Sequence, residues 1–309
     1  MTDGAVRAWV LAARPQTLPA AVAPVLVGTG LAVHDGVFSA LPALAALLGA
    51  ALIQIGTNFA NDYYDAVQGA DTDEREGFTR VTQAGIIEPA RVRAAAFTTF
   101  GVAIVLGTTL VYVGGLPVVV IGLASVASGW AYTGGPYPLG YVGLGDLFVF
   151  VFFGLVAVTG TYYVQAADRL ADPLPLGVPT GTVTWEALVA GAAIGALATA
   201  ILVVNNIRDR ETDAAAGKRT LAVRLGYRVS RVQYAALLVL AFVVPPVLVV
   251  GATHGMAVLL PLVTAPYALW ICRTVWTRTD GAALNPALEQ TGRLLAAYAV
   301  LFSIGVVVG

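Results

Sequence analysis

The chain has 309 residues, of which 58% are hydrophobic and only 11% are charged, and its net charge is −1. Soluble domains carry about 25% charged residues, so the composition excludes an ordinary soluble domain and predicts an integral membrane protein. The near-neutral charge also excludes a basic surface for nucleic acid, and the single cysteine excludes an internal disulfide.

Nine apolar runs follow one another along the chain, each near the roughly 20 residues that cross a bilayer as a helix. They are Leu18–Val33, Phe38–Ala60, Val92–Val113, Leu116–Tyr132, Leu144–Ala166, Ala187–Val204, Val232–Val250, Gly255–Trp276 and Thr291–Val308. We therefore expect an all-α integral membrane protein with nine transmembrane helices, in one polytopic domain over residues 1–309.

The distribution of basic residues predicts the orientation of this domain. Nine crossings would place the two termini on opposite sides of the membrane. With a cytoplasmic N-terminus, all but one of the 17 lysines and arginines fall on the cytoplasmic side, and only Arg169 lies outside. Cytoplasmic loops are enriched in these residues. The sequence thus predicts a multi-pass protein of the cell membrane with an outer C-terminus. Before the first run, we expect a short interfacial helix anchored by Trp9 and Arg14.

The stretch NDYYDAVQGADTDER, residues 61–75, continues the second apolar run and holds five acidic residues. Asn61 and Asp65 lie four residues apart, which places them on one face of a helix. Gly69 then favours a break in the helix, and Asp71 follows on a loop. Acidic residues that continue an apolar span in this way are less easily explained as a solvated loop.

A second acidic cluster follows the sixth apolar run, in the sequence NNIRDRETDAAAGKR. Asn205, Asp209 and Asp213 are spaced four apart and would also share a helix face. Both clusters contain the element Asn-x-x-x-Asp followed by another aspartate, and both would lie in the cytoplasm. This similarity predicts two pseudo-repeats, about residues 18–132 and 144–250, with residues 291–308 as the ninth span.

The two clusters predict a site for a metal-bound diphosphate. Like charges on one helix face repel each other, so a cation is expected to compensate them. Mg²⁺ prefers oxygen ligands and commonly bridges carboxylates to substrate phosphates. Four nearby basic residues can contact phosphate oxygens: Arg75, Arg80, Lys218 and Arg219. A ligand with a diphosphate head at the membrane edge and an apolar tail among the helices, such as a polyprenyl diphosphate, has the required shape.

Taken together, the runs and motifs resemble the UbiA-type family of intramembrane prenyltransferases, over essentially the whole chain. Three further stretches carry this resemblance: RPQTLPAAVAPVLVGTGLA, YTGGPYPLGYVGLGDLFVFVFFGLVAVTGTYYVQA and NPALEQTGRLLAAYAVLFSIG. They look most like the branch that prenylates 1,4-dihydroxy-2-naphthoate. The 4-hydroxybenzoate branch tends to have a third aspartate four residues after the second, where this chain has Gly69. Gln16 stands where the naphthoate branch commonly has lysine.

The resemblance implies a UbiA-type helix bundle, Mg²⁺ as cofactor, and two substrates, a polyprenyl diphosphate and an aromatic acid. Metal and diphosphate binding is carried over to Asn61, Asp65, Asp71, Asn205, Asn206, Asp209 and Asp213, of which the four aspartates are the catalytic candidates. Phosphate contacts are carried over to Lys218 and Arg219, with Arg75 in support. The implied reaction transfers the prenyl group to the naphthoate with loss of diphosphate and CO₂, giving demethylmenaquinone.

Aromatic faces could steady the allylic cation that such a reaction forms. The candidates near the expected membrane edge are Tyr132, Tyr137, Tyr141, Tyr162 and Tyr163, together with the amide of Asn58. Each tyrosine could equally be an interfacial anchor. Asp146 starts the fifth run and is either a functional acid or a helix cap.

Two alternatives remain open at this point. Another acceptor, such as 4-hydroxybenzoate, would keep the family and change the product. A cation-coupled transporter would belong to a different class, but its coupling acids would lie near the bilayer midplane, whereas these acids lie at the ends of spans. Neither the prenyl chain length nor the oligomeric state follows from these patterns.

Overall fold

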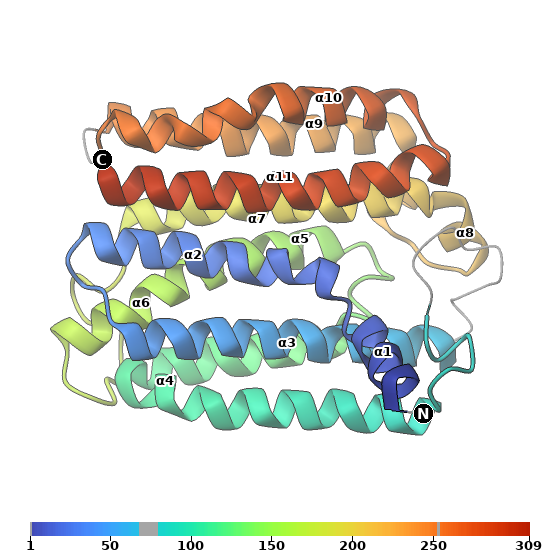
Figure 1. Cartoon of the computed structure of the whole chain (residues 1–309), viewed down its shortest axis with the longest axis horizontal. Helices are drawn as coiled ribbons and strands as arrows, with labels where there is room; N and C mark the ends of the chain where they lie inside the picture. The colour runs from blue at the N-terminus through green and yellow to red at the C-terminus, as the bar shows by residue number, and fades with distance from the viewer. Residues whose placement is uncertain (1, 68–79, 252–253) are drawn as a thin grey trace.

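The computed structural model describes residues 2–67, 80–251 and 254–309, which form a bundle of long helices with no strand in these ranges (Figure 1). The N-terminal half contains α1 (Thr2–Ala13), the 3₁₀ turn η1 (Pro15–Thr17), α2 (Leu18–His34), α3 (Ala40–Val67), α4 (Pro89–Ala131), α5 (Gly145–Val149), the π-helical η2 (Phe150–Val156) and α6 (Ala157–Leu170). The C-terminal half contains α7 (Trp185–Arg208), α8 (Arg210–Ala215), α9 (Leu221–Val250), the 3₁₀-helical η3 (Met256–Thr264), α10 (Ala265–Thr277) and α11 (Gly281–Val308). The N- and C-termini lie at opposite ends of the bundle (Figure 1).

The expected all-α membrane bundle is confirmed, but the count of nine spans is corrected. Within the described ranges, eight helical stretches are long and apolar enough to cross a membrane. The difference arises at α4, whose 43 residues contain two of the expected runs joined at Gly115. Gly115 has non-helical dihedral angles (φ 60°, ψ −147°), and α4 folds back there into two arms (Figure 1). Accordingly, the ring of Phe100 in the first arm approaches within 3.5 Å of where a Cβ on Gly129 in the second arm would lie.

Helix α7 lies at the centre of the bundle and is rich in buried alanines. It meets η2 backbone to backbone, because a Cβ on Gly154 of η2 would lie 2.4 Å from the Cα of Gly195 in α7. Gly191, one turn before Gly195, makes a similarly close approach to Gly154 and Leu155. Small residues spaced four apart allow such close packing of membrane helices, where no difference in hydrophobicity drives them together.

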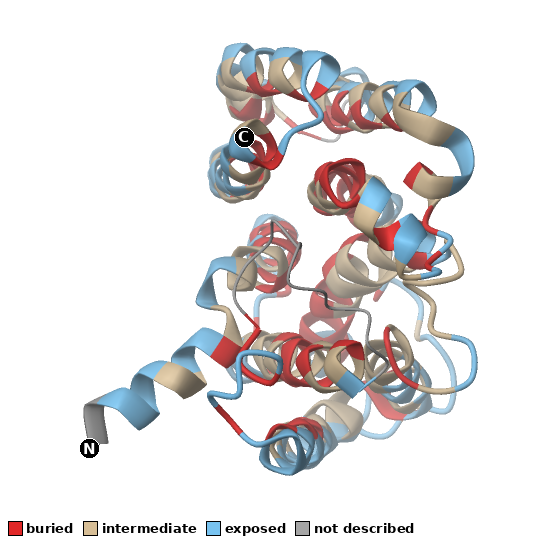
Figure 2. Cartoon of the chain, turned by 90° about the vertical axis from the view of Figure 1, so that its right-hand side faces the viewer, coloured by how far each residue is buried: buried red, intermediate tan, exposed pale blue. Residues whose placement is uncertain are grey.

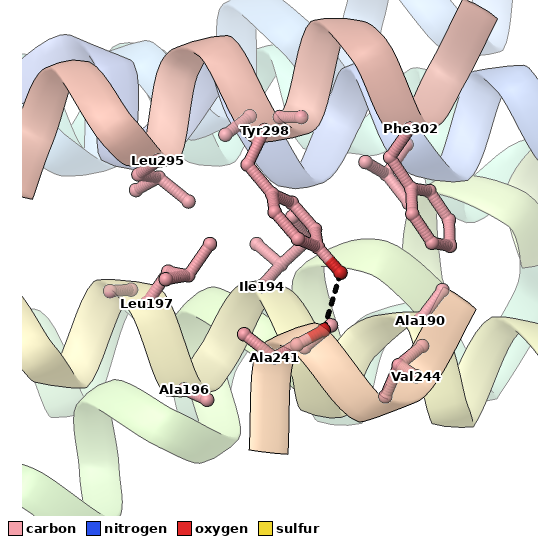
Figure 3. Packing of buried hydrophobic residues seen from close by; sticks show 14 of the residues in the cluster. Ala190, Ile194, Ala196, Leu197, Ala241, Val244, Leu295, Tyr298 and Phe302 are labelled. Carbon is pink, nitrogen blue, oxygen red and sulfur yellow. Dashed lines mark hydrogen bonds between the residues drawn. The ribbon is translucent and has the colours of Figure 1, made fainter. Parts of the chain in front are cut away.

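The packing of α11 on α7 and α9 is centred on Tyr298 (Figure 3). The Tyr298 hydroxyl donates a hydrogen bond of 2.6 Å to the backbone carbonyl of Ala241 in α9. In a regular helix, this carbonyl would accept from the N–H four residues later, but that residue is Pro245, which has none. Tyr298 thus satisfies a buried carbonyl that the proline leaves without its helical partner. The ring of Tyr298 also stacks on Phe302 at 5.9 Å.

The two histidines, which lie 220 positions apart in the sequence, are brought together at the end of the bundle where α2 finishes. The rings of His34 and His254 stack with their centroids 4.3 Å apart. Asp35 bonds to His34 Nδ1 at 2.8 Å and accepts a 2.7 Å hydrogen bond from the Tyr162 hydroxyl. Burial, followed by the neighbouring His34 ring, lowers the pKa of His254 below its usual value of 6.5, while the charges of Asp35 and Glu186 oppose this shift.

This histidine contact predicts a loss of stability in mild acid. The unfolded protein binds a proton at His254 more strongly than the folded protein does, so stability falls as the pH drops below about 6.5, by up to about 1.4 kcal/mol per pH unit. We expect His254→Gln to reduce the fall in Tm of the purified protein between about pH 7.5 and about pH 5.5. An unchanged pH dependence of Tm in this variant would show that other groups control acid stability.

Candidate functional site

A polar cavity of about 570 Å³ lies at the end of the bundle where α3 and α7 finish, near α1 and α8 (Figure 1). Its polar lining comes from both sequence clusters and from the segments that cover them: Arg14, Gln16, Thr17, Asn61, Asp65, Arg80, Tyr132, Thr133, Tyr141, Asn205, Asn206, Arg208, Asp209, Asp213, Lys218, Glu289 and Arg293. This volume is within the usual range for small-molecule sites.

Asp65, on the last turns of α3, is a buried carboxylate of the first cluster that lines the cavity. It is 2% exposed, and its Oδ2 accepts a 2.6 Å hydrogen bond from Arg80 Nη2. Its Oδ1 accepts a short hydrogen bond from the Tyr141 hydroxyl. Asn61, one turn earlier, accepts a 2.8 Å hydrogen bond from the Thr133 hydroxyl at its amide oxygen. These contacts come from two separate segments, the one before α4 and the one between α4 and α5, so folding fixes both side chains in the cavity wall.

In the second cluster, Asp209 immediately follows α7 and is held by its neighbour Arg208. The guanidinium contacts both carboxylate oxygens, with Nε at 2.6 Å and Nη2 at 2.7 Å. Arg208 also donates to the amide oxygens of Asn205 and Asn285, each at 2.8 Å. Bidentate arginine–carboxylate pairs are geometrically specific. Arg208 thus ties the end of α7 to the start of α11.

Lys218 joins the two clusters. Its Nζ lies 3.7 Å from Oδ1 of Asp65 and 3.5 Å from Oδ1 of Asp213, and it stands 4.6 Å from the centroid of the Tyr141 ring. Carboxylates that are about 150 residues apart in the sequence therefore meet around one cationic atom. Oxygen donors from two elements converging on one positive charge are the donor set that a hard divalent cation such as Mg²⁺ prefers, so these residues fit the expected metal.

The other residues that the sequence predicted for the site lie in different places. Asn205, Asn206 and Tyr132 line the polar cavity, as expected. Arg219 is exposed and lies outside the cavity lining, and its backbone N–H donates to the carbonyl of Tyr141 at 2.7 Å. Tyr162 bonds to Asp35 at the far end of the bundle, so the structure does not bring it to this site. Asp71 and Arg75 fall outside the described residues.

Asn58, a candidate from the sequence, has a structural role in positioning η1. Its amide donates to the carbonyl of Ala13 at 2.9 Å and to the hydroxyl of Thr17 at 2.8 Å, so it holds η1 against α3. Gln54, one turn earlier, donates to the same Thr17 hydroxyl at 3.0 Å. Asn58 is absent from the cavity lining, and it supports the cavity wall from behind.

Three other candidates also lie away from the polar cavity lining. Tyr163 donates to the carbonyl of Gly114 at 2.7 Å, beside the reversal of α4. Tyr137 is 78% exposed, which is consistent with an interfacial position. Asp146 is buried at the start of α5 and accepts a 3.1 Å hydrogen bond from Gln233 in α9.

Two structural roles were not predicted from the sequence. One is the role of Arg208 in the site, and the other is the contact between Asp62 and the segment before α4. Asp62 accepts the backbone N–H groups of Val81 and Thr82, at 3.2 and 2.9 Å, and lies 3.4 Å from Arg14 Nη2. It therefore fixes the segment that carries Arg80 rather than facing the cavity. The adjacent pair Arg208–Asp209 was the available signal, since an arginine next to a predicted ligand can contact it.

A second, apolar cavity of about 360 Å³ continues from the polar one into the bundle. The two cavities share Gln54, Tyr132, Val149 and Phe153. The rest of the apolar lining comes from α2, α3, both arms of α4, η2 and α6. The combined space therefore has a polar head, a junction at Tyr132 and an apolar extension, which suits an amphiphilic ligand.

Comparisons with known proteins agree with this geometry. Residues 21–301 match the UbiA prenyltransferase family. A relative from Mycobacterium leprae, a 1,4-dihydroxy-2-naphthoate octaprenyltransferase, is 42% identical, with 94% of this chain and 93% of the relative covered. The fold is similar to the apo structure of a UbiA homologue from Aeropyrum pernix, with a TM-score of 0.71, 14% identity, and coverage of 94% of this chain and 97% of the other. It is also similar to a UbiA homologue from Archaeoglobus fulgidus bound to DMAPP and Mg²⁺, with a TM-score of 0.60, 16% identity, and coverage of 96% and 99%.

Proposed function

Since this chain belongs to the UbiA prenyltransferase family, we propose that it transfers a polyprenyl group from a polyprenyl diphosphate to 1,4-dihydroxy-2-naphthoate. The observation that carries the proposal is the meeting of both Asp-rich clusters around Lys218, at the mouth of a cavity with an apolar extension. Diphosphate and CO₂ would leave, and the product would be demethylmenaquinone, formed in its hydroquinone state. We also propose that this end of the bundle faces the cytoplasm.

The diphosphate would bind in the polar cavity. Asp65, Asp209 and Asp213 would hold Mg²⁺, and the positive groups of Lys218 and Arg80 lie within reach of phosphate oxygens. When bound, Mg²⁺ would neutralise the charge that builds on the leaving diphosphate. Asn61 and Asn205 can orient the same oxygens through their amides. Their positions at the ends of α3 and α7 are fixed before substrate arrives, as electrostatic stabilisation of a transition state requires.

The prenyl chain would extend past Tyr132 into the apolar cavity. This direction places the allylic carbon, where the C–O bond breaks, near the junction that Tyr132, Gln54 and Phe153 line. The aromatic faces there can stabilise positive charge on that carbon. The surrounding apolar residues exclude water, which would otherwise capture the cation.

The aromatic acceptor would occupy the part of the polar cavity between α2 and α11. The lining there includes the small residues Pro19 and Ala20 of α2, and Gly292 and Ala296 of α11 beside the larger Leu288, Glu289 and Arg293. A ring carbon of the naphthoate would attack the allylic carbon. Loss of the carboxylate as CO₂ would then return a bonding electron pair to the ring and restore its aromaticity. The small side chains leave room for a bicyclic ring.

A product assay tests the proposed function. Membranes that contain the protein would be incubated with Mg²⁺, a radiolabelled polyprenyl diphosphate, and either 1,4-dihydroxy-2-naphthoate or 4-hydroxybenzoate. We expect label on the naphthoate together with release of CO₂, and no transfer after EDTA treatment until Mg²⁺ is restored. Label on the benzoate alone would overturn the proposed acceptor, and transfer in EDTA would overturn the metal role.

The proposed tail cavity gives a matched pair of substitutions. Gly107 and Gly101 both lie in the first arm of α4, and a Cβ on either would meet nothing within 4 Å, but Gly107 lines the apolar cavity and Gly101 does not. We expect Gly107→Phe to raise KM for a long-chain donor about tenfold, a cost of about 1.4 kcal/mol, because the added ring occupies tail space. Gly101→Phe should leave KM unchanged. Equal KM values for the two variants would mean that the tail lies elsewhere.

A further inference from the structure

Helix α1 lies across the axis of the bundle, unlike the spans. Figure 2 looks along the bundle, so the long helices are seen end-on, while α1 is seen from its side and extends away from them. It lies at the same end of the molecule as α8 and the polar cavity (Figure 1). If the spans cross the membrane along the bundle axis, α1 is parallel to the membrane surface, at the level where the apolar spans give way to charged segments.

The inner face of α1 packs on the bundle. The ring of Trp9 meets Phe59 of α3 edge-on, with centroids 5.7 Å apart, and Ala12 is fully buried. Of the two residues expected to anchor this helix, Trp9 is half-buried against Phe59 and Arg14 contacts Asp62, so both also hold α1 on the protein.

The outer face of α1 is apolar and exposed. Val6 is 62% exposed, Val10, one turn later, is 50% exposed, and Leu11 is 38% exposed. In water, apolar surface costs about 25 cal/mol per Å² relative to burial. Arg7 lies beside Val6 and is also exposed, so an apolar strip and a cationic group share this face. A helix parallel to the membrane with such a face is typical of binding in the headgroup layer of a bilayer.

We propose that α1 is a membrane-surface helix, with Val6, Val10 and Leu11 inserted among the lipid acyl chains just below the headgroups and Arg7 against lipid phosphates. The lipid bilayer would thus cover the exposed apolar face of α1. The exposed apolar surface of the spans supports this choice, since α4 presents Phe97 at 56% exposure near the same end, where lipid must cover it.

Seating α1 in lipid also fixes one wall of the polar cavity. The helix runs directly into Arg14, which has a left-handed backbone conformation (φ 52°, ψ 68°), and then into η1. Gln16 and Thr17 of η1 line the cavity, and Asn58 ties Ala13 and Thr17 together across this bend. Lipid contact at α1 thereby holds the wall beside the acceptor space. This consequence for catalysis rests on the proposed function, whereas the lipid contact does not.

Spin labels test the depth of α1. In a Cys272→Ser background, single cysteines would replace Val6 and Val10, with Val105 on the lipid-facing side of α4 and Glu211 on α8 as the lipid and water references. Val105 is 70% exposed, and the Glu211 side chain is 72% exposed, so neither change disturbs packing. Power-saturation EPR in proteoliposomes would compare collisions with oxygen, which concentrates in lipid, and with a water-soluble nickel chelate.

We expect the labels at positions 6 and 10 to lie about 5–10 Å below the lipid phosphates, between the two references. Nickel accessibility equal to that at position 211 would overturn the proposal. The measurement contains no substrate, so its failure is distinct from failure of the proposed function. As a second readout, Val6→Glu with Val10→Glu should move a label at Leu11 into water and raise KM for the acceptor several-fold. A label that stays in lipid in this double variant would also count against the proposal.

Discussion

Asp65→Asn and Asp209→Asn are each expected to lower the rate of prenyl transfer by a factor of about 10³ or more, while the protein remains in the membrane. Each substitution removes a charged oxygen ligand from one of the two clusters that meet at Lys218. Under the proposed function, a transition state that transfers charge to the leaving diphosphate depends on the Mg²⁺ that those oxygens would hold. Initial rates with saturating donor and acceptor, measured across Mg²⁺ concentrations, would quantify the loss.

The matched control for these variants is Glu211→Gln. Glu211 lies two residues after Asp209, but its exposed carboxylate pairs with Arg210 at the surface, and it is absent from the cavity lining. We expect its rate to equal that of the unmodified protein. Each aspartate variant also removes an ion pair with a buried arginine, Arg80 or Arg208, so a melting curve must accompany each rate. Normal turnover from either aspartate variant would refute the two-cluster site.

Gly115→Ala is expected to prevent assembly of the bundle. A Cβ at this position would lie 1.9 Å from the carbonyl oxygen of Pro175, well inside contact distance. The backbone angles at Gly115 (φ 60°, ψ −147°) fall close to a region that is essentially restricted to glycine. The neighbouring Leu116 N–H donates to the same carbonyl at 2.9 Å, so relieving the clash would break the contact between the turn and the loop that joins α6 to α7.

Gly101→Ala in the first arm of α4 is the control, since an added Cβ there meets nothing within 4 Å. We expect this variant to match the unmodified protein in yield and Tm, and Gly115→Ala to give little monodisperse protein after detergent extraction. The strain at Gly115 alone is worth about 1–3 kcal/mol, and the clash adds to it. Recovery of Gly115→Ala with an unchanged Tm would mean that the reversal of α4 tolerates a side chain.

The sequence predicted the helix bundle well because a helix that crosses lipid needs a long apolar segment, and such segments are visible in a single sequence. It also predicted that residues at the ends of two distant spans share a site, since both clusters continue apolar helices and share a spacing. The count differed at α4 because two apolar runs follow each other there without a connecting loop, so they form one continuous stretch that folds back into two arms at Gly115.

Side-chain partners were harder to predict because they depend on tertiary packing. Tyr141 reaches Asp65 only after the loop after α4 has docked on α3, and Arg208 reaches Asn285 only after α11 has packed beside the end of α7. Tyr162 belongs to the same apolar run as Asp146 but lies near the opposite end of that run. Its hydroxyl therefore bonds to Asp35 at the far end of the bundle and not to a residue of the site. Asn58 has the right residue type beside the cluster, yet its side chain points away to hold η1.

The division of the site between the two halves of the chain affects how the enzyme is made. Asp65 is synthesised early, whereas Asp213 and Lys218, which meet it, follow about 150 residues later, and Gly292 of the cavity wall comes later still. Under the proposed function, a nascent or truncated chain that ends before α7 would carry only one of the two carboxylate clusters and would not cleave a diphosphate during insertion into the membrane. Two fragments divided in the loop between α6 and α7 would each be inert, and activity would return only when they dock, so turnover itself would report completed assembly.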